Sequence, residues 1–206
     1  CSTLTRPAPR SPSSGENVSK DQYNAVFSAK TPCMDALMAV KNRSRTVRAH
    51  GTAVGLPSDD DMGNSEVGYN ALGAGQVINQ GAALVDKALA DGSLFTGDGW
   101  HHVASNLSNG GTLHLIGLLS DGGVHSRTDQ LFGIIRGAVE RGTKKLRVHI
   151  LTDGRDVPDG SSLKFIDELE AVLKEVSATC DAKIASGGGR MAVTMDRYEA
   201  DWNIVK

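Results

Sequence analysis

Three apolar segments alternate with two amphipathic helical patterns in the second half of this 206-residue sequence. TLHLIGLL (112–119) is an almost continuous apolar run, as expected of a buried parallel strand, and KLRVHIL (145–151) and AKIAS (182–186) follow it. Between these segments, apolar residues recur at helical spacing from about residue 128 and again from Ser162, which predicts two helices. Strands that alternate with helices of this length predict a βαβαβ unit, which is an α/β fold with a parallel sheet and right-handed crossovers.

The first half of the chain carries weaker structural signals. Thr31 and Pro32 suit the N-cap and the first position of a helix, and residues 46–50 (TVRAH) fit a short strand. A long loop leads from there to Ser65, after which apolar residues at near-helical spacing predict a helix. A further helix is expected over about 79–90, ended by the Asp-Gly pair that follows it.

Polar and charged residues follow each of the predicted strands. The three segments read SDGGVHSR, TDGRDVPDG and SGGGRM, and they contain His125, Arg155, Asp156 and Arg190. Because ligands of open parallel sheets bind just past the carboxyl ends of the strands, we expect these side chains to share one edge of the sheet. Two guanidinium groups there suit a small dianion with a phosphate and a carboxylate. Asp156 and His125 are then candidates to bind or deprotonate hydroxyl groups.

Several of these features also have simpler explanations. SGGGR on its own is typical of a flexible turn, and GAGQV (73–77) lacks the last glycine of a dinucleotide-binding motif. We expect His114 and His149 to be core or sheet-face residues, and the acidic run 59–61 to be a solvated loop rather than a metal site. The strand-end set is favoured because three successive strand ends carry it.

Composition and charge exclude several classes of protein. The net charge of -2 argues against a general nucleic-acid binder, and no stretch approaches the roughly 20 apolar residues of a membrane helix. Three scattered cysteines without a CxxC pair favour reduced thiols in a reducing compartment such as the cytoplasm. Because the sequence starts at Cys1 and its last amphipathic segment has no stop signal, we expect a fragment. Residues 1–22 are expected to be a disordered tail, with a transit peptide as the alternative.

Ser65 lies in the segment DMGNSEVGYN (61–70), where Gly63 and Gly68 flank it. Glycines let other atoms approach the backbone closely, which suits a nucleophile held in the open. A serine hydroxyl is a poor nucleophile without a base or a metal, and no histidine is near it in sequence, so a metal ligated from elsewhere is the better supposition. An N-cap serine explains the same residue equally well, and both interpretations stay open here.

Four longer motifs, in this order along the chain, resemble one known family: DMGNSEVGYNALGAG, LHLIGLLSDGGVHSR, RVHILTDGRDVPDGSS and IASGGGRMAVTMDRYEADW. They resemble the cofactor-independent phosphoglycerate mutases of the plant and trypanosomatid type, which belong to the alkaline-phosphatase superfamily. The likeness runs from about Tyr23 to Lys206. It implies a substrate-binding transferase domain, here 80–206, that is inserted in a metal-bearing phosphatase-like domain, of which 23–79 would be the N-terminal part.

The resemblance also implies an activity and a set of site residues. The family interconverts 3-phosphoglycerate and 2-phosphoglycerate in glycolysis and gluconeogenesis through a phosphoserine, with two Mn²⁺ ions (or Mg²⁺ or Co²⁺) and without 2,3-bisphosphoglycerate. By position, Ser65 would be the catalytic nucleophile and a metal ligand, and Asp156 would carry the proton of the glycerate hydroxyl. The substrate-binding residues would be His125, Arg155, Asp156, Arg190 and Arg197. The implied enzyme is a cytoplasmic or plastid monomer with a small-molecule substrate and no nucleic-acid or membrane partner.

The chain departs from the family pattern at several places. The family begins with an apolar strand that ends in a metal-binding Asp, and PRSPSSGENVSKDQ stands there instead. Its other His and Asp metal ligands belong to a C-terminal region beyond this sequence. Tyr69, Gln76 and Ala192 stand where the family has His, Arg and an aromatic residue. We therefore expect a catalytically inactive fragment of the enzyme. The alternatives are a phosphohydrolase of the same superfamily and a non-catalytic phosphoglycerate-binding module.

Overall fold

The computed structural model describes residues 23, 25–43, 47–61, 63–195 and 203. The tail expected over 1–22 and the candidate residue Arg197 lie outside the described residues. The elements in chain order are α1 (Ala25–Ser28), α2 (Pro32–Ala39), η1 (Gly51–Val54), α3 (Ser65–Ala74), α4 (Gly81–Ala90), η2 (Ser93–Phe95), α5 (Asp98–Ser108), β1 (Leu113–Leu119), α6 (Thr128–Glu140), β2 (Lys145–Thr152), α7 (Ser162–Glu175), η3 (Val176–Ala178), β3 (Asp181–Gly189) and α8 (Arg190–Val193).

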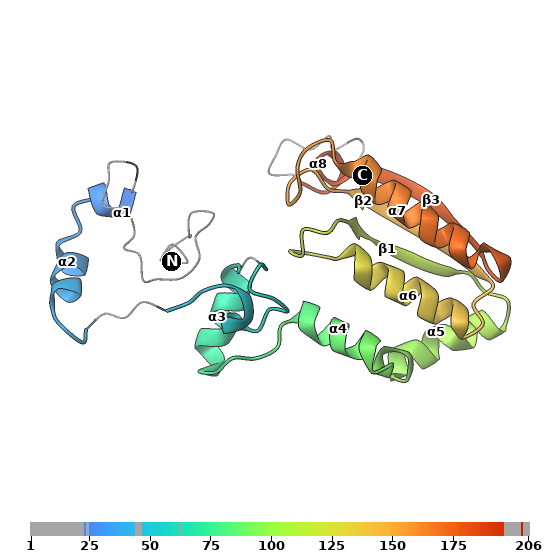
Figure 1. Ribbon diagram of the computed structural model, residues 1–206, viewed down its shortest axis with the longest axis horizontal. Helices are drawn as coiled ribbons and strands as arrows, with labels where there is room; N and C mark the ends of the chain where they lie inside the picture. The colour runs from blue at the N-terminus through green and yellow to red at the C-terminus, as the bar shows by residue number, and fades with distance from the viewer. Residues whose placement is uncertain (1–22, 24, 44–46, 62, 196–202, 204–206) are drawn as a thin grey trace.

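A three-stranded parallel sheet with the order β1-β2-β3 organises the second half of the chain (Figure 1). Helix α6 connects the first two strands and α7 connects the last two, as the alternating pattern predicts. Gly142 ends the first connection in the left-handed conformation, with a φ of 94°, and its N–H donates to the carbonyl of Val139 at 2.9 Å. The α/β fold with a parallel βαβ sheet is thus confirmed.

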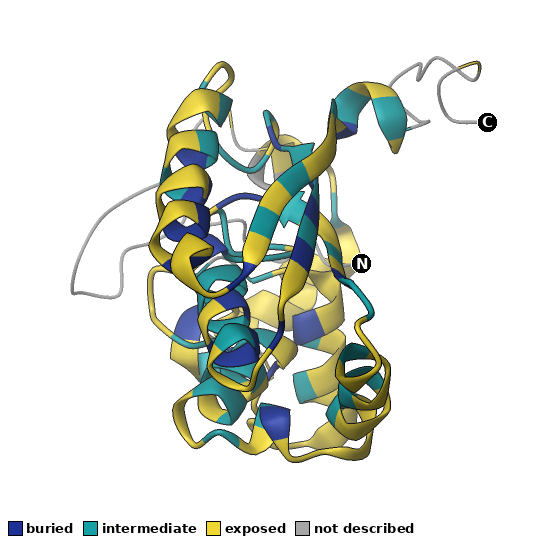
Figure 2. Ribbon diagram, turned by 90° about the vertical axis from the view of Figure 1, so that its right-hand side faces the viewer, coloured by how far each residue is buried: buried dark blue, intermediate teal, exposed yellow. Residues whose placement is uncertain are grey.

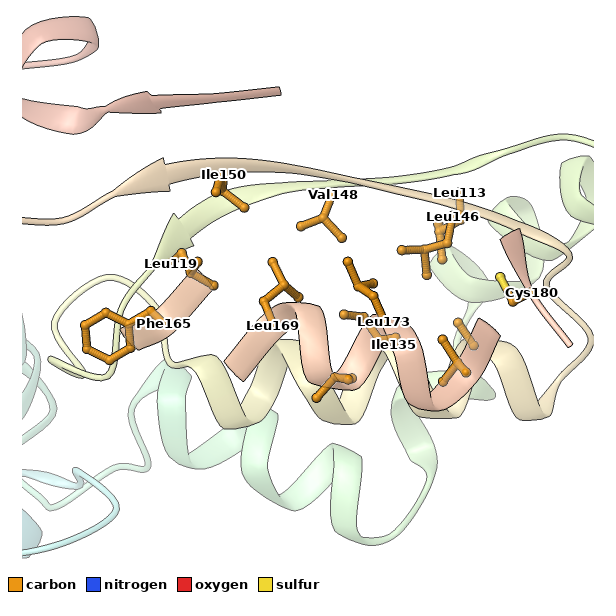
Figure 3. Close-up of a cluster of buried hydrophobic side chains, with 13 residues drawn as sticks. Leu113, Leu119, Ile135, Leu146, Val148, Ile150, Phe165, Leu169, Leu173 and Cys180 are labelled. Carbon is orange, nitrogen blue, oxygen red and sulfur yellow. The ribbon is translucent and has the colours of Figure 1, made fainter. Parts of the chain in front are cut away.

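One face of the sheet carries the main hydrophobic core. Figure 3 shows side chains of the strands meeting those of α6 and α7, which lie on the same side of the sheet. Ile135 of α6, Leu146 of β2 and Leu169 of α7 are completely buried. Full burial of such a side chain contributes about 1.5–3 kcal/mol, so these positions hold both helices to the sheet.

The opposite face of the sheet is only partly covered, so the expectation of a fully buried first strand is wrong. Ile116 of β1 is 78% exposed, and buried and exposed residues alternate along the strands in Figure 2. His114 and His149 lie on this face, with His114 Nδ1 2.9 Å from His149 Nε2. The prediction that these histidines are sheet-face residues is confirmed.

A second layer of helices packs below α6. Phe95 of η2 is buried and meets Trp100 of α5 edge to face, with 4.9 Å between the ring centroids. The guanidinium of Arg141 lies over the Phe95 ring, 4.0 Å from its centroid. Gly137 of α6 is buried against this ring, because an added Cβ there would lie 2.2 Å from Phe95 Cζ. The absence of a side chain at Gly137 is therefore what lets Phe95 pack under α6.

The segment before α4 is built from helices and a closely packed loop. Helix α2 begins at Pro32 after Thr31, as predicted, but it buries no residue. Residues 47–50 form no strand, so that expectation is wrong for the part of 46–50 that the structure describes. The loop that follows packs on 78–80, where Gln80 Nε2 donates to the carbonyl of Val54 at 3.1 Å. Gly55 has a φ of 84°, and an added Cβ would overlap the Ile78 carbonyl, so this turn requires glycine.

Strand β3 is longer than the sequence indicates. Ser186 to Gly189 pair with His149 to Thr152 of β2, so the interpretation of SGGGR as a flexible turn is wrong. A register shift at Val148 and His149 precedes this pairing. An added Cβ at Gly187 would lie 3.0 Å from Ile150 Cγ1, and one at Gly188 would lie 3.0 Å from Val193 Cγ2. The glycines thus allow close packing within a strand, which is a second use of glycine besides turns.

Candidate functional site

Asp153 is the centre of a hydrogen-bond network at the carboxyl ends of the strands. It directly follows β2, and its side chain is 0% exposed. Its Oδ2 accepts a hydrogen bond of 2.6 Å from the hydroxyl of Ser120, the residue that follows β1. Its Oδ1 accepts from the backbone N–H of Arg155 at 3.0 Å and of Asp156 at 3.1 Å. One carboxylate therefore joins the end of β1 to the loop that follows β2.

Arg190 brings the third strand end into the same network. It is the first residue of α8, directly after β3, and its side chain is only 6% exposed. Its Nη1 donates to Asp153 Oδ1 at 3.0 Å and to Asp156 Oδ2 at 2.6 Å. Burial alone would lower the pKa of Arg190, but its hydrogen bonds to these two carboxylates and their charges raise it overall. The guanidinium is therefore held as a cation in a fixed position.

The same contacts keep Asp153 ionised. Burial taken alone would raise the pKa of this carboxyl group, since a charge is costly away from water. The hydrogen bonds from Ser120, from the two loop amides and from Arg190 outweigh that effect and hold the pKa of Asp153 below its usual value. Asp153 is thus a buried, fully hydrogen-bonded anion, which is the arrangement that makes a buried charge tolerable.

His125 completes a group of three candidate residues that the fold brings together. Its Nε2 lies 3.8 Å from Asp156 Oδ2, and its side chain is 55% exposed, whereas that of Asp156 is 14% exposed. The loop after β1 reaches this position because Gly122 is small. A Cβ added at Gly122 would lie 3.0 Å from both Cβ and the carbonyl oxygen of Asp156. His125, Asp156 and Arg190, each from a different strand end, therefore adjoin as the sequence predicts.

The other two predicted substrate-binding arginines have different outcomes. Arg155 is exposed, and its backbone N–H is bound by Asp153, so it belongs to the same loop and edge. Arg197 lies outside the described residues, and its role stays a prediction.

Ser65 is the first residue of helix α3 and is exposed. The N-cap is Asn64, whose Oδ1 accepts from the backbone N–H of Val67 at 3.0 Å. The interpretation of Ser65 as an N-cap serine is therefore wrong, because the preceding residue performs that function. The first turn of a helix carries partly positive N–H groups, which favour a nearby anion such as a phosphate.

The loop that precedes α3 lies against the loop that follows β1. A Cβ added at Gly123 would be only 3.2 Å from Asp61 Oδ1. Arg127 of the same β1–α6 loop also interacts electrostatically with the Asp61 carboxylate. Burial alone would lower the pKa of Arg127, but the hydrogen bond and charge of Asp129 and the charges of Asp86 and Asp61 raise it overall. The segment that leads to Ser65 thus adjoins the loop that carries His125.

The acidic run 59–61 is a structural loop, as expected. Asp59 Oδ1 accepts from the backbone N–H of Thr52 at 3.0 Å and from its hydroxyl at 2.6 Å, and Arg48 donates to Oδ2 at 3.1 Å. These hydrogen bonds lower the pKa of Asp59 to about 2. Asp61 accepts from the N–H and the hydroxyl of Ser58. Both carboxylates are therefore used to hold the loop.

The residues near Ser65 do not make a complete metal site. Within the part of the chain that the structure describes, no group of three or more His, Cys, Asp and Glu side chains could hold a metal ion. Asn64 caps the helix instead of facing a metal, and Asp59 and Asp61 are bound within their own loop. A metal at Ser65 would need further ligands that the described residues do not supply.

Sequence analysis missed two members of the site, Ser120 and Asp153. Both stand at the start of segments that the sequence analysis quoted, SDGGVHSR and TDGRDVPDG, directly at a strand end. Position was the available signal, since the first residue after a parallel strand lies at the ligand-binding edge. Their burial is not visible in the sequence.

No helix in the described ranges is long and apolar enough to cross a membrane.

These features define an α/β protein with a charged, phosphate-compatible site at the carboxyl edge of a parallel sheet. Residues 85–206 match the family described as BPG-independent PGAM N-terminus. This chain belongs to that family, the 2,3-bisphosphoglycerate-independent phosphoglycerate mutases. The resemblance stated from the sequence motifs is therefore confirmed.

Curated relatives and a solved structure support the same family. The chain is 63% identical over 188 residues to the 2,3-bisphosphoglycerate-independent phosphoglycerate mutase of Zea mays, and 61% identical over 189 residues to that of Trypanosoma brucei brucei. These matches cover 90% and 91% of this chain but only 34% of each relative, so the chain spans about a third of their length. A crystal structure of Leishmania mexicana phosphoglycerate mutase at low cobalt concentration matches with a TM-score of 0.74 and 62% identity, over 90% of this chain and 34% of that one.

Proposed function

We propose that this chain is the N-terminal part of an enzyme that interconverts 3-phosphoglycerate and 2-phosphoglycerate without 2,3-bisphosphoglycerate. The observation that carries the proposal is the meeting of His125, Asp156 and Arg190 at three neighbouring strand ends. Membership of the mutase family supports the substrate, and the charges support it independently. A guanidinium and an imidazole bind phosphate and carboxylate oxygens, while a carboxylate accepts a proton from a hydroxyl.

Each site residue has a role in the proposed reaction. Arg155, Arg190 and Arg197 bind the anionic groups of the phosphoglycerate, and His125 contacts it from the loop after β1. When the phosphate ester bond breaks, the released glycerate oxygen takes up a proton, and the other hydroxyl must lose one before phosphate returns. Asp156 carries these protons, and its position between His125 and Arg190 supports that role.

Ser65 accepts the phosphoryl group in this proposal. Its Oγ forms the new bond to phosphorus as the bond to the glycerate oxygen breaks, and the proton that Oγ loses balances the one that the released glycerate oxygen takes up. The other glycerate oxygen then forms the bond to phosphorus as the Oγ–phosphorus bond breaks, and the proton lost by that hydroxyl balances the one that Oγ regains. Two features of Ser65 support this role: it is the first residue of α3, and Asn64 rather than Ser65 caps that helix. The loop that precedes α3 also lies close to Gly123 in the loop that carries His125. The family implies two Mn²⁺, Mg²⁺ or Co²⁺ ions with Ser65 as one ligand. Because the described residues make no complete metal site, we assign no step to a metal in this chain.

The remaining proposals concern organisation and location. Residues 23–79 belong to a phosphatase-like domain and 80–206 to a transferase domain, and the family match over 85–206 supports that division. The enzyme is a cytoplasmic monomer that binds neither nucleic acid nor membranes. The free thiols of Cys33 and Cys180 support a reducing compartment, since disulfides are rare there. On its own, the chain binds phosphoglycerate and does not complete the reaction.

Calorimetric titration of the chain with 3-phosphoglycerate tests this proposal. We expect saturable binding that His125→Ala and Arg155→Ala each weaken about tenfold or more, since each removes one group that contacts the ligand. Both side chains are exposed, so their loss should leave the fold intact. Arg136→Ala is the matched control. It removes an arginine that pairs with Glu175 at 2.8 Å across α6 and α7, and binding should not change.

Three results would contradict parts of the proposal. A folded chain that does not bind 3-phosphoglycerate would refute substrate binding by these strand ends. Release of inorganic phosphate during the titration would favour the phosphohydrolase. Formation of 2-phosphoglycerate by this chain alone would contradict the inference that it lacks a complete site.

A further inference from the structure

We infer that Asp153 is a positioning residue for the substrate-binding set, and that it fixes Arg190 independently of Asp156. This inference rests on the proposed phosphoglycerate binding, which it deepens by naming the group that organises the site.

Every hydrogen bond that the structure shows for the Asp153 side chain goes to a strand-end residue. Oδ2 is bound by Ser120, and Oδ1 is bound by the N–H groups of Arg155 and Asp156 and by Arg190 Nη1. Ser120 in turn accepts a hydrogen bond of 3.1 Å from the N–H of Gly122, in the loop that carries His125. One buried carboxylate thus sets the relative positions of all three strand ends.

Arg190 is held by two carboxylates that differ in exposure. The side chain of Asp153 is 0% exposed, whereas that of Asp156 is 14% exposed and also lies near His125. Asp156 can therefore turn toward a ligand hydroxyl, but Asp153 has no comparable freedom. If Asp156 were the sole partner of Arg190, its use in proton transfer would release the guanidinium. Asp153 prevents this, because its contact with Arg190 persists when Asp156 moves.

The bonds to Arg190 also leave its other nitrogens for a ligand. Within the described residues, both of its hydrogen bonds to carboxylates use Nη1. The Arg190 side chain is 6% exposed, and neither Asp153 nor Asp156 bonds to its Nε or Nη2. The Nε–Nη2 edge of a guanidinium presents two parallel N–H groups, the arrangement that binds a phosphate or carboxylate bidentately. Asp153 therefore holds Arg190 by one nitrogen, and the Nε–Nη2 edge takes no part in the bonds to the two carboxylates.

The substitution Asp153→Asn tests the inference with little change in shape. The Asn side chain still accepts from the two loop amides through its oxygen, and its NH₂ group can donate to Ser120. It cannot provide the charge that holds Arg190. Asp167→Asn, on the exposed face of α7, is the matched control for the same chemical change. Ser120→Ala is a milder second variant, because it removes one hydrogen bond and keeps the Asp153 charge.

The first readout is the ¹⁵N side-chain NMR signal of Arg190 without ligand. In the wild-type chain we expect a slowly exchanging guanidinium signal, since the group is buried and paired on a fixed carboxylate. That signal should be lost in Asp153→Asn, be broadened in Ser120→Ala and be unchanged in Asp167→Asn. Thermal unfolding of each variant verifies that it is folded. If Asp153→Asn does not fold, the Ser120→Ala result decides the matter.

The second readout is 3-phosphoglycerate binding by calorimetry. Loss of a hydrogen bond to a charged group predicts that Asp153→Asn binds about tenfold to hundredfold more weakly than the wild type. An Asp153→Asn variant that keeps both the Arg190 signal and the wild-type affinity would overturn the inference, even while the wild type binds. If the wild-type chain does not bind at all, the proposed function fails. In that case loss of the Arg190 signal in Asp153→Asn still supports Asp153 as the group that fixes this arginine, and retention of the signal refutes it.

Discussion

Gly137→Ala is the substitution whose effect the structure defines most closely. Gly137 lies in the last turn of α6, against the buried ring of Phe95. A Cβ at this position would lie 2.2 Å from Cζ and 2.4 Å from Cε2 of that ring. The ring would have to move by about 1.3 Å or more to reach van der Waals distance. It has little room to do so, because Trp100 packs on its edge and Arg141 covers its face.

The change in the free energy of unfolding is the balance between one stabilising effect and several destabilising ones. Alanine is a better helix former than glycine by about 1 kcal/mol, which alone would stabilise the protein. Overpacking a buried site costs about 1–3 kcal/mol. Moving the ring also weakens its contact with Trp100, worth about 0.5–1.5 kcal/mol, and with Arg141, worth about 0.5–1 kcal/mol. The net expectation is a loss of about 1–4 kcal/mol in the free energy of unfolding.

Equilibrium unfolding in urea measures this loss as a lower midpoint at an unchanged slope. Gly99→Ala in α5 is the control, since no atom lies within 4 Å of an added Cβ there and the helix preference alone should act. Adding Phe95→Leu to Gly137→Ala should recover part of the lost stability, because the smaller side chain makes room, and this coupling appears as non-additivity. A Gly137→Ala variant as stable as the wild type would refute the reasoning.

Two further predictions concern the strand-end site. Gly122→Ala places a Cβ 3.0 Å from the Cβ and carbonyl oxygen of Asp156, so we expect 3-phosphoglycerate binding to weaken about tenfold. The free energy of unfolding in urea should change by about 1 kcal/mol or less. Unchanged affinity in calorimetry would mean that the two loops are free to separate. The pKa of Asp153 is lower in the folded chain than in the unfolded chain, so its contribution to stability is present above about pH 4 and is lost as the pH falls through the folded-state pKa. The difference in unfolding free energy between wild type and Asp153→Asn should therefore be largest near neutral pH and shrink toward pH 3, and a pH-independent difference would contradict the assigned charge.

Much of the fold and part of the site follow from local sequence patterns. The apolar runs and the helical spacing between them predict β1, β2 and their connecting helices, because periodicity reports which faces are buried. Topology then places His125, Asp156 and Arg190 together, since the carboxyl ends of parallel strands share one edge. The proximity of these three residues can therefore be predicted without knowledge of side-chain contacts.

The errors arise where tertiary packing overrides local preference. Ser186–Gly189 has the composition of a loop, because glycine disfavours strands, yet the backbone of β2 and the Ile150 side chain require a strand without side chains there. Residues 47–50 carry a strand-like pattern but have no strand partner in the described chain. A strand exists only by pairing, and pairing depends on distant residues.

The N-cap residue of α3 and the burial of Asp153 could not be predicted from the sequence either. Asn64 and Ser65 are both good N-cap residues, so the helix start alone could not decide which one caps α3. The sequence pattern did not single out Asp153, and its role became visible only with its contacts to Ser120 and Arg190. Sequence patterns indicate which polar side chains lie at the carboxyl edge of the sheet, but they do not show which of these side chains are buried.

The order of the three strands also limits when the site can exist during synthesis of the protein. The network needs Ser120, Asp153 and Arg190 together, and these residues follow three different strands along the chain. A nascent chain on the ribosome cannot form it until β3 and Arg190 have emerged from the exit tunnel and paired with β2. Parallel pairings between distant segments form slowly, so the carboxylate of Asp153 stays without its Arg190 partner at least until the chain has grown by another 37 residues. The guanidinium that makes its burial tolerable is among the last parts of the sheet to arrive.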